Sequence, residues 1–205
     1  MDHGRRSPRQ QRSRQTVAWI LEAAAQLFRE HGYLATTTNK VAERAGVSIG
    51  SLYQYFSDKD DLLAALAEEH MERTAREVED ALAACAREEA PLPRLVGALA
   101  EAAARAHMHD PGIHPLLIDQ ALHRPDLVDG LRALEGRIAA SLAAELRRVH
   151  GGGPDPATAA LLAVQGINAQ VHGALLWPPP GRTADEVLKA LVRMWTAALG
   201  AAPER

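Results

Sequence analysis

The sequence predicts an all-α protein of about nine helices, and three observations indicate this fold class. Alanine and leucine supply most of the apolar residues, which make up 47% of the chain, and both favour helices. Aromatic residues, which favour strands, make up only 4%, and β-branched residues are also scarce. Apolar positions recur in steps of three and four, as on one face of an α-helix. The 205 residues suffice for one domain, or for a small domain beside a larger one.

The first segment predicts a basic arm followed by a helix. Residues 1–13 contain Arg, Gln, Ser and Pro and almost nothing apolar, so we expect them to be disordered. This arm is either a solvated tail or a polycation that contacts phosphates. Residues 15–31 then show the apolar period of a helix, and Gly32 supplies the left-handed residue that ends it.

Two short helices are expected next, each with its own capping residue. Thr37 is a suitable N-cap for the second helix, which Gly46 ends. Ser48 can cap a third helix that runs to about Phe56. The candidate caps of a fourth helix, which starts near Lys59, are Ser57 and Asp58.

Prolines and glycines divide the remaining chain into further helices, and no segment predicts a strand or an internal repeat. Apolar residues at helical spacing continue between these breaks. The later helices are expected at about residues 92–109, 113–122, 127–149, 156–177 and 184–199.

Residues 37–56 carry the pattern of a helix-turn-helix. Ala42 is small enough for the close approach of two helices, and Gly46 tolerates the positive φ of a tight turn. Leu52 then anchors the second helix by one buried side chain. The remaining inner positions are Val41, Ala45 and Val47.

Charge is distributed unevenly along the chain. The net charge is −3, but residues 1–59 hold nine basic and five acidic side chains, so the acidic excess lies in the remainder. A basic front and an acidic rear suggest two separate tasks.

Several classes of protein are disfavoured. The single Cys85 excludes an intrachain disulfide and suits a reducing cytoplasm. The N-terminus lacks the apolar core of a signal peptide, and no apolar run is long enough to span a membrane. No phosphate loop, nucleophile motif or zinc spacing is present, so we expect no enzyme, no cofactor and no metal. The histidine-rich stretch of His107, His109, Asp110 and His114 has the wrong geometry for a metal site on a helix.

The front of the chain resembles the TetR/AcrR family of bacterial transcriptional regulators. The similarity covers residues 23–66, AAAQLFREHGYLATTTNKVAERAGVSIGSLYQYFSDKDDLLAAL, nearly throughout. Residues 67–205 resemble the family only in helix number and order. The resemblance implies a helix-turn-helix domain at residues 14–60 and a helical ligand-binding and dimerisation domain at residues 61–205. It also implies a cytoplasmic repressor that binds double-stranded operator DNA.

The third helix needs an inward anchor and an outward reading face. Leu52 and Phe56 are four residues apart and are expected to point inward, whereas a Tyr hydroxyl can donate to phosphate. Gln54 can read adenine and Ile49 can contact a thymine methyl, although many relatives carry Lys or Arg near position 49. Tyr55 has an alternative role as a half-buried core ring. The candidate DNA-binding residues are Ser48, Ile49, Gly50, Ser51, Tyr53, Gln54, Tyr55 and Lys59, with the capping Thr37 and, by resemblance, Thr38 and Asn39.

One recognition helix reads only a few base pairs, so two-fold pairing is expected. Small residues recur every seven positions on the helix of residues 156–177, and an apolar stripe follows the last helix. Two such helix pairs would form a four-helix interface between the subunits of a homodimer, whereas the alternative is burial in a monomer's core. The candidate interface residues are Ala159, Gly166, Gly173, Leu188, Leu191 and Trp195.

The family resemblance implies an effector pocket among the middle helices, whose occupation would release DNA. We expect a small, largely apolar effector. The polar candidates for its contacts are His107, Gln120, Gln165, Asn168 and His172, and the apolar ones are Met108, Leu116, Leu117 and Trp177. The alternative is a rear domain that only dimerises or binds a protein partner.

Overall fold

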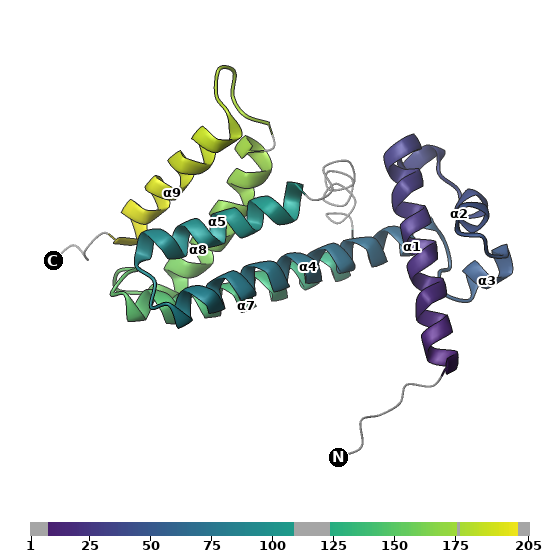
Figure 1. Cartoon of the computed structure of the whole chain (residues 1–205), viewed down its shortest axis with the longest axis horizontal. Helices are drawn as coiled ribbons and strands as arrows, with labels where there is room; N and C mark the ends of the chain where they lie inside the picture. The colour runs from purple at the N-terminus through teal and green to yellow at the C-terminus, as the bar shows by residue number, and fades with distance from the viewer. Residues whose placement is uncertain (1–7, 109–123, 176, 201–205) are drawn as a thin grey trace, which may run out of the picture. The chain divides into compact units, whose positions relative to one another are not determined.

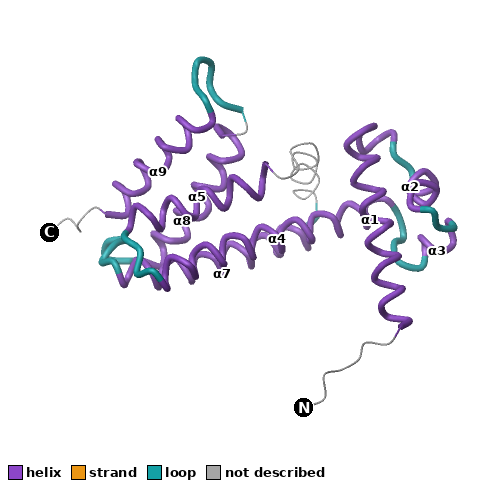
Figure 2. The backbone as a smooth tube through the Cα atoms, viewed as in Figure 1, coloured by secondary structure: helices purple, strands orange, loops and turns teal. Residues whose placement is uncertain are grey.

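The computed structural model of the chain describes residues 8–108, 124–175 and 177–200, except for the side chains of residues 8–11 and 107. Within these ranges it contains eight α-helices, one π-helical turn and no strand (Figures 1 and 2). The predicted all-α fold class is therefore confirmed. The helix expected at residues 113–122 lies outside the described residues.

The helices follow one another through short connections. Their bounds are α1 Pro8–Ala35, α2 Thr38–Ala45, α3 Ile49–Tyr53, α4 Lys59–Arg87, α5 Leu92–Met108, α7 Pro125–Arg148, α8 Pro156–Gln170, the π-helical turn Val171–Leu175 and α9 Ala184–Gly200. These bounds agree closely with the predicted ones from α2 to α7.

Helix α1 begins seven residues earlier than the sequence pattern indicated, because residues 8–14 are helical. Proline is well suited to the first position of a helix, and the Arg and Gln residues that follow it are good helix formers. At the other end, Gly32 has φ 75° and ψ 169°, which interrupts the regular helix where the sequence predicted its end.

The most apolar helix also differs from the expectation. A single helix was expected at residues 156–177, but α8 ends at Gln170 and a π-helical turn follows it. A π-helical turn inserts one residue into the helical repeat, which rotates the side chains that follow. His172 lies in this turn.

The described residues form two compact units. The division along α4 falls between Glu69 and His70, whereas the sequence placed it between residues 60 and 61. The first unit also includes residues 124–127 at the start of α7. Its buried apolar residues include Ile20, Leu27, Phe28, Val41, Ala42, Leu52, Phe56, Leu62 and Leu63.

The second unit has an alanine-rich core between α4, α5, α7, α8 and α9. Fully buried alanines such as Ala100, Ala160 and Ala163 let the helices approach closely. A Cβ at Gly166 of α8 would lie 2.8 Å from Cη2 of Trp195 of α9 and closer still to Cζ2. The absence of a side chain at position 166 is therefore what lets the indole lie across α8.

Among the helices that the structure describes, none combines the length and the apolar character needed to cross a membrane.

Candidate nucleic-acid interface

Helix α2 is delimited by the residues that the sequence predicted. The Thr37 side chain accepts a hydrogen bond from the Lys40 backbone N–H at 3.3 Å, which caps the start of the helix. Gly46 ends it with φ 66°, in the left-handed region that glycine tolerates without strain. The next N–H, from Val47, donates to the Ala42 carbonyl at 3.0 Å and completes the turn. The predicted helix-turn-helix turn is thus formed.

Helix α3 has only five residues, so its cap and anchor matter more than its length. Ser48 Oγ accepts from the Ser51 N–H at 3.0 Å, and the two hydroxyl oxygens lie 2.8 Å apart. Leu52 is fully buried, as the sequence predicted. Its carbonyl accepts from the N–H groups of Tyr55 and Phe56, which continues the turn beyond the helix proper.

An ion pair fixes α2 on α1. Arg44 donates to both carboxylate oxygens of Glu30, at 3.0 and 2.8 Å, and to Gln26 Oε1 at 3.4 Å. The Arg44 hydrogen bond lowers the pKa of Glu30, and the same bond raises the pKa of Arg44. The sequence reasoning missed this pair because its two members are 14 residues apart on different helices.

The connection from α1 to α2 is held by a buried hydroxyl. Thr36 is 1% exposed, and its Oγ1 donates to the carbonyl oxygens of Leu27 at 3.2 Å and Gly32 at 2.8 Å. A buried polar group is stable only when it is hydrogen-bonded, and Thr36 satisfies this condition within the loop. It therefore has a structural role.

The outward face of the helix-turn-helix consists largely of the predicted DNA-binding residues. Tyr53 is 53% exposed, and its hydroxyl lies 3.1 Å from Thr38 Oγ1 on α2. Tyr55 is 38% exposed, which argues against the alternative of a buried core ring. The other predicted residues that are exposed are Thr37, Asn39, Ser48, Ile49, Gly50 and Gln54, while Thr38 and Ser51 are half-buried.

Lys59 is directed differently from the expectation. Its Nζ donates to the Tyr33 carbonyl at 3.2 Å and lies 4.1 Å from the centroid of the Tyr33 ring. Tyr33 in turn packs on Phe28, with ring centroids 5.7 Å apart. The ammonium therefore ties the start of α4 to the end of α1, because a carbonyl and an aromatic face both attract it. The sequence had assigned it to a phosphate instead.

The start of α4 carries a reciprocal cap. Asp58 Oδ1 accepts from the N–H groups of Asp60 at 2.8 Å and Asp61 at 2.9 Å, so Asp58 is the N-cap. Asp61 Oδ2 accepts from the Ser57 N–H at 3.0 Å and from the Ser57 hydroxyl. The hydroxyl bond is the main cause that lowers the pKa of Asp61.

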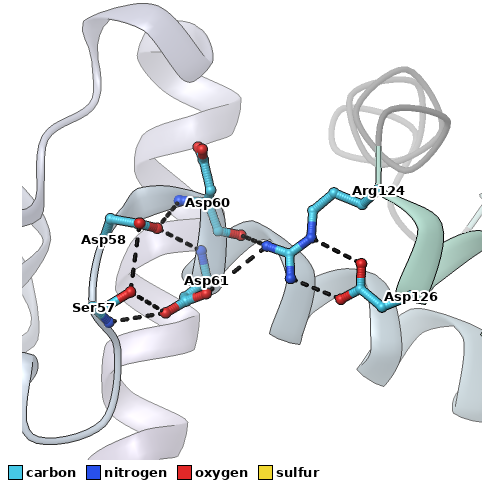
Figure 3. Close-up of polar contacts among 6 residues, drawn as sticks. All are labelled: Ser57, Asp58, Asp60, Asp61, Arg124 and Asp126. Carbon is cyan, nitrogen blue, oxygen red and sulfur yellow. Dashed lines mark hydrogen bonds and ion pairs between the residues drawn. The ribbon is translucent and has the colours of Figure 1, made fainter.

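Arg124 joins this cap to the first residues of α7 (Figure 3). Its Nε and Nη2 donate to the two oxygens of Asp126 at 3.2 and 2.7 Å, which lowers the pKa of that carboxyl group. Its Nη1 donates to the Asp60 carbonyl at 3.4 Å and lies 3.8 Å from Asp61 Oδ1. The sequence reasoning treated Arg124 only as part of a helix break, and no local signal connects it to residues 60 positions earlier.

The predicted effector-binding residues of the second unit are partly brought together. Asn168 and His172 are half-buried one helical turn apart, and His172 Nδ1 donates to the Asn168 carbonyl at 2.9 Å. Burial lowers the pKa of His172, and this hydrogen bond opposes that shift. Gln165, in contrast, is exposed and donates to Glu135 Oε2 at 2.9 Å. It therefore lies on the surface between α8 and α7.

The other candidates for effector contacts are less informative. Met108 and Trp177 are 51% and 62% exposed. His107 belongs to α5, and its side chain lies outside the described part. Leu116, Leu117 and Gln120 lie outside the described residues.

The predicted interface residues are partly used within one chain. Trp195 covers Gly166 and donates its Nε1–H to Gln170 Oε1 at 2.8 Å, while Leu191 is 5% exposed. Ala159 and Leu188 are half-buried, and Gly173 is exposed. The apolar side chains that α8 and α9 leave open to solvent are Leu161, Leu162 and Met194, at 38%, 57% and 49%.

A capped two-helix segment with a buried leucine and a polar outward face, followed by a separate helical unit, defines a helix-turn-helix DNA-binding protein. Two family models agree with this class. Residues 20–66 match the model of bacterial regulatory proteins of the tetR family, and residues 91–199 match the tetracyclin repressor-like C-terminal domain. The chain belongs to the TetR family of bacterial regulators, as its front segment predicted.

Known relatives agree in sequence at the front and in fold throughout. The transcriptional regulator HbdR of Aromatoleum sp. is 54% identical over 44 residues, which cover 22% of this chain and 19% of that protein. The matched segment thus spans about a fifth of this curated relative. A TetR/AcrR-family regulator from Thermobifida fusca has a TM-score of 0.69 at 21% identity, covering 88% of this chain and 96% of its own.

A third similar structure contains a ligand. FadR from Bacillus subtilis, solved with stearoyl-CoA, has a TM-score of 0.67 at 18% identity, covering 89% of this chain and 98% of its own. At this identity the likeness shows the shared fold.

Proposed function

We propose that the protein is a transcriptional regulator, most simply a repressor, that binds a palindromic operator as a homodimer in the bacterial cytoplasm. One observation carries the proposal: Leu52 is fully buried while its neighbours Tyr53 and Gln54 are exposed on the same short helix. A recognition helix needs this division, because one face anchors it and the other meets the bases. The proposal assigns the chain no catalytic activity.

The outward side chains can divide the work between bases and backbone. Gln54 can form the paired hydrogen bonds that identify adenine, and Ile49 can contact a thymine methyl. The adjacent hydroxyls of Tyr53 and Thr38 can donate to one phosphate. Thr37 and Asn39 are exposed beside them at the start of α2. Lys59 contributes by holding the start of α4 in place.

Selection of bound duplexes from random DNA tests this assignment. We expect a two-fold symmetric consensus, and Gln54→Ala should relax the preference at one position of each half-site by about 1–3 kcal/mol. Gln165→Ala is the matched control, because it removes an exposed glutamine from the other unit. The proposal fails if no consensus emerges, or if both variants change it equally.

The basic arm should supply sequence-independent affinity, since Ile49 adds no charge to the recognition helix. Deletion of residues 1–13 is then expected to flatten the salt dependence of binding. An unchanged slope would show that the arm does not contact phosphates. Since residues 8–13 belong to α1, deletion of residues 1–7 is the matched control for loss of helix structure.

Dimerisation is proposed through α8 and α9. Leu161, Leu162 and Met194 leave apolar surface exposed there, and burial of such surface drives association. Leu162→Glu should give a monomer in sedimentation analysis, while Leu34→Glu, at an 89% exposed leucine of the first unit, should not. A dimeric Leu162→Glu protein would place the interface elsewhere.

Release by a small, largely apolar effector completes the proposal. The fold shared with FadR in its stearoyl-CoA complex supports a ligand-binding role for the second unit, and the half-buried Asn168 and His172 are its best-placed polar candidates. A compound screen for loss of the operator complex tests this step. If no compound releases DNA while Leu162→Glu abolishes pairing, the second unit serves dimerisation alone.

A further inference from the structure

Arg73 of α4, in the second unit, makes an unusual contact for an arginine. The residue is half-buried, and its Nη2 lies 3.1 Å from Nδ1 of His70, which is 8% exposed. A guanidinium can only donate, so His70 Nδ1 accepts and carries no proton in this arrangement. The positive charge of Arg73 is therefore paired with a ring nitrogen that offers no negative charge.

The Nε of Arg73 has no acceptor. It is fully buried and makes no hydrogen bond within the described part of the protein. Buried polar groups are normally hydrogen-bonded, and a donor on a charged group without a partner is destabilising. The same edge of Arg124 shows what is missing: there, Nε and Nη2 donate together to the two oxygens of Asp126 (Figure 3).

The acidic residues around Arg73 do not pair with it. Glu72 lies within 4.0 Å of Arg76 and 3.6 Å of Arg137, and Glu79 accepts from Arg137 at 3.3 Å. Glu77 is one helical turn away, a spacing that often gives an ion pair, but no ion pair joins it to Arg73 in the described residues. The structure thus contains a half-buried cation that its own carboxylates leave open.

We propose that Arg73 binds the anionic group of the effector, so that the ligand is an amphipathic anion with an apolar body and a carboxylate or phosphate head. This inference rests on the proposed function and specifies the chemical class of the ligand. A planar guanidinium edge matches a carboxylate or a phosphate, which accept two parallel hydrogen bonds. The anion would take the Nε–H and share or replace the contact between Nη2 and His70.

Calorimetric titration of the full-length protein without DNA tests the proposal, with decanoate, decanoyl-coenzyme A and uncharged decanol as probes. We expect at least one anionic probe to bind, and decanol to bind about tenfold or more weakly. Decanoate binding identifies a carboxylate head. Binding of only the coenzyme A ester identifies a phosphate head. Failure of both anions to bind, or equal binding of decanol, overturns the proposal.

Two variants assign the effect to this side chain. Arg73→Gln should weaken the anionic probe about tenfold to a hundredfold, because a charge-assisted hydrogen-bonded contact is lost. Arg76→Gln is the matched control, since it removes an exposed, ion-paired arginine from the same helix and should leave affinity unchanged. Unchanged affinity in Arg73→Gln, or equal losses in both variants, would refute the assignment.

A third variant guards against misfolding. Arg73→Lys keeps the charge but lacks the planar edge, and we expect it to lose part of the affinity while its circular dichroism stays native. Operator binding is measured separately on all three variants. Anion binding without operator binding contradicts the proposed function alone, and operator binding without anion binding contradicts this inference alone.

Discussion

The two units of the protein are stabilised in different ways. In the first, α2 and α3 have eight and five residues and depend on individual polar contacts, such as the caps by Thr37 and Ser48 and the Arg44–Glu30 pair. In the second, helices of 15 residues or more pack through alanines. Short helices have little intrinsic stability, so their geometry has to be imposed by such contacts.

This difference suggests a division between accuracy and adaptability. The DNA-binding unit holds a small set of side chains in one geometry, so the loss of one contact should impair binding. The second unit distributes its stability over many small apolar contacts, each of them weak. Substitutions in the two units, ordered by expected effect, can test the comparison.

The largest effect is expected at the anchor of the recognition helix. Leu52→Ala removes a fully buried side chain and should cost about 2–5 kcal/mol of stability, with loss of operator binding. Leu162→Ala, at a 57% exposed leucine, is the control for stability. Urea denaturation followed by circular dichroism measures both, and equal costs would contradict the structure.

The closest helix contact of the second unit should give the next largest effect. Gly166→Ala forces a Cβ against the Trp195 ring and should destabilise by about 1–3 kcal/mol. Gly136→Ala on α7 meets no atom within 4 Å and should instead stabilise by about 0.5–1 kcal/mol. A neutral Gly166→Ala protein would mean that α8 and α9 separate easily.

The loss of one cap should have a moderate effect. Ser48→Ala leaves the Ser51 N–H of α3 without its side-chain acceptor, which costs about 1 kcal/mol. Because α3 is so short, we expect operator affinity to fall while the melting temperature changes little. Ser48→Asp, which restores a capping oxygen, is the control for helix structure, and fluorescence anisotropy with labelled DNA measures affinity.

The smallest effect is expected from His172 and depends on pH. Burial lowers the pKa of His172 below its ordinary value of 6.5. Below pH 6.5 the unfolded chain therefore binds a proton that the folded one does not, and stability falls as the pH drops toward the folded pKa. His172→Gln should reduce this loss and leave stability above pH 6.5 nearly unchanged. Thermal melting across this range measures it, and an unaltered pH profile would disagree with the burial.

Features that depend on neighbours in sequence were predictable. Thr37, Ser48 and Gly46 act on backbone groups within five residues, so the sequence contains the whole signal. The inward position of Leu52 follows from the same short period. Lys59 shows the limit, because its partner Tyr33 is 26 residues away.

Features that depend on distant residues were not predictable. The contact of Gly166 with Trp195 looked like a site for a second chain, since spacing alone cannot tell which helix fills the gap. The Arg124 contacts and the unpaired Nε of Arg73 likewise depend on three-dimensional placement. The early start of α1 was missed because a polar, basic composition suits both a tail and an exposed helix.

The position of Trp195 gives the protein an intrinsic optical probe. The chain has three tryptophans, and two of them, Trp19 and Trp177, are 54% and 62% exposed. Trp195 lies across α8 with its ring N–H bonded to Gln170. Replacing the other two by phenylalanine would leave one fluorophore whose emission wavelength reports whether α8 and α9 stay in contact, without any added label.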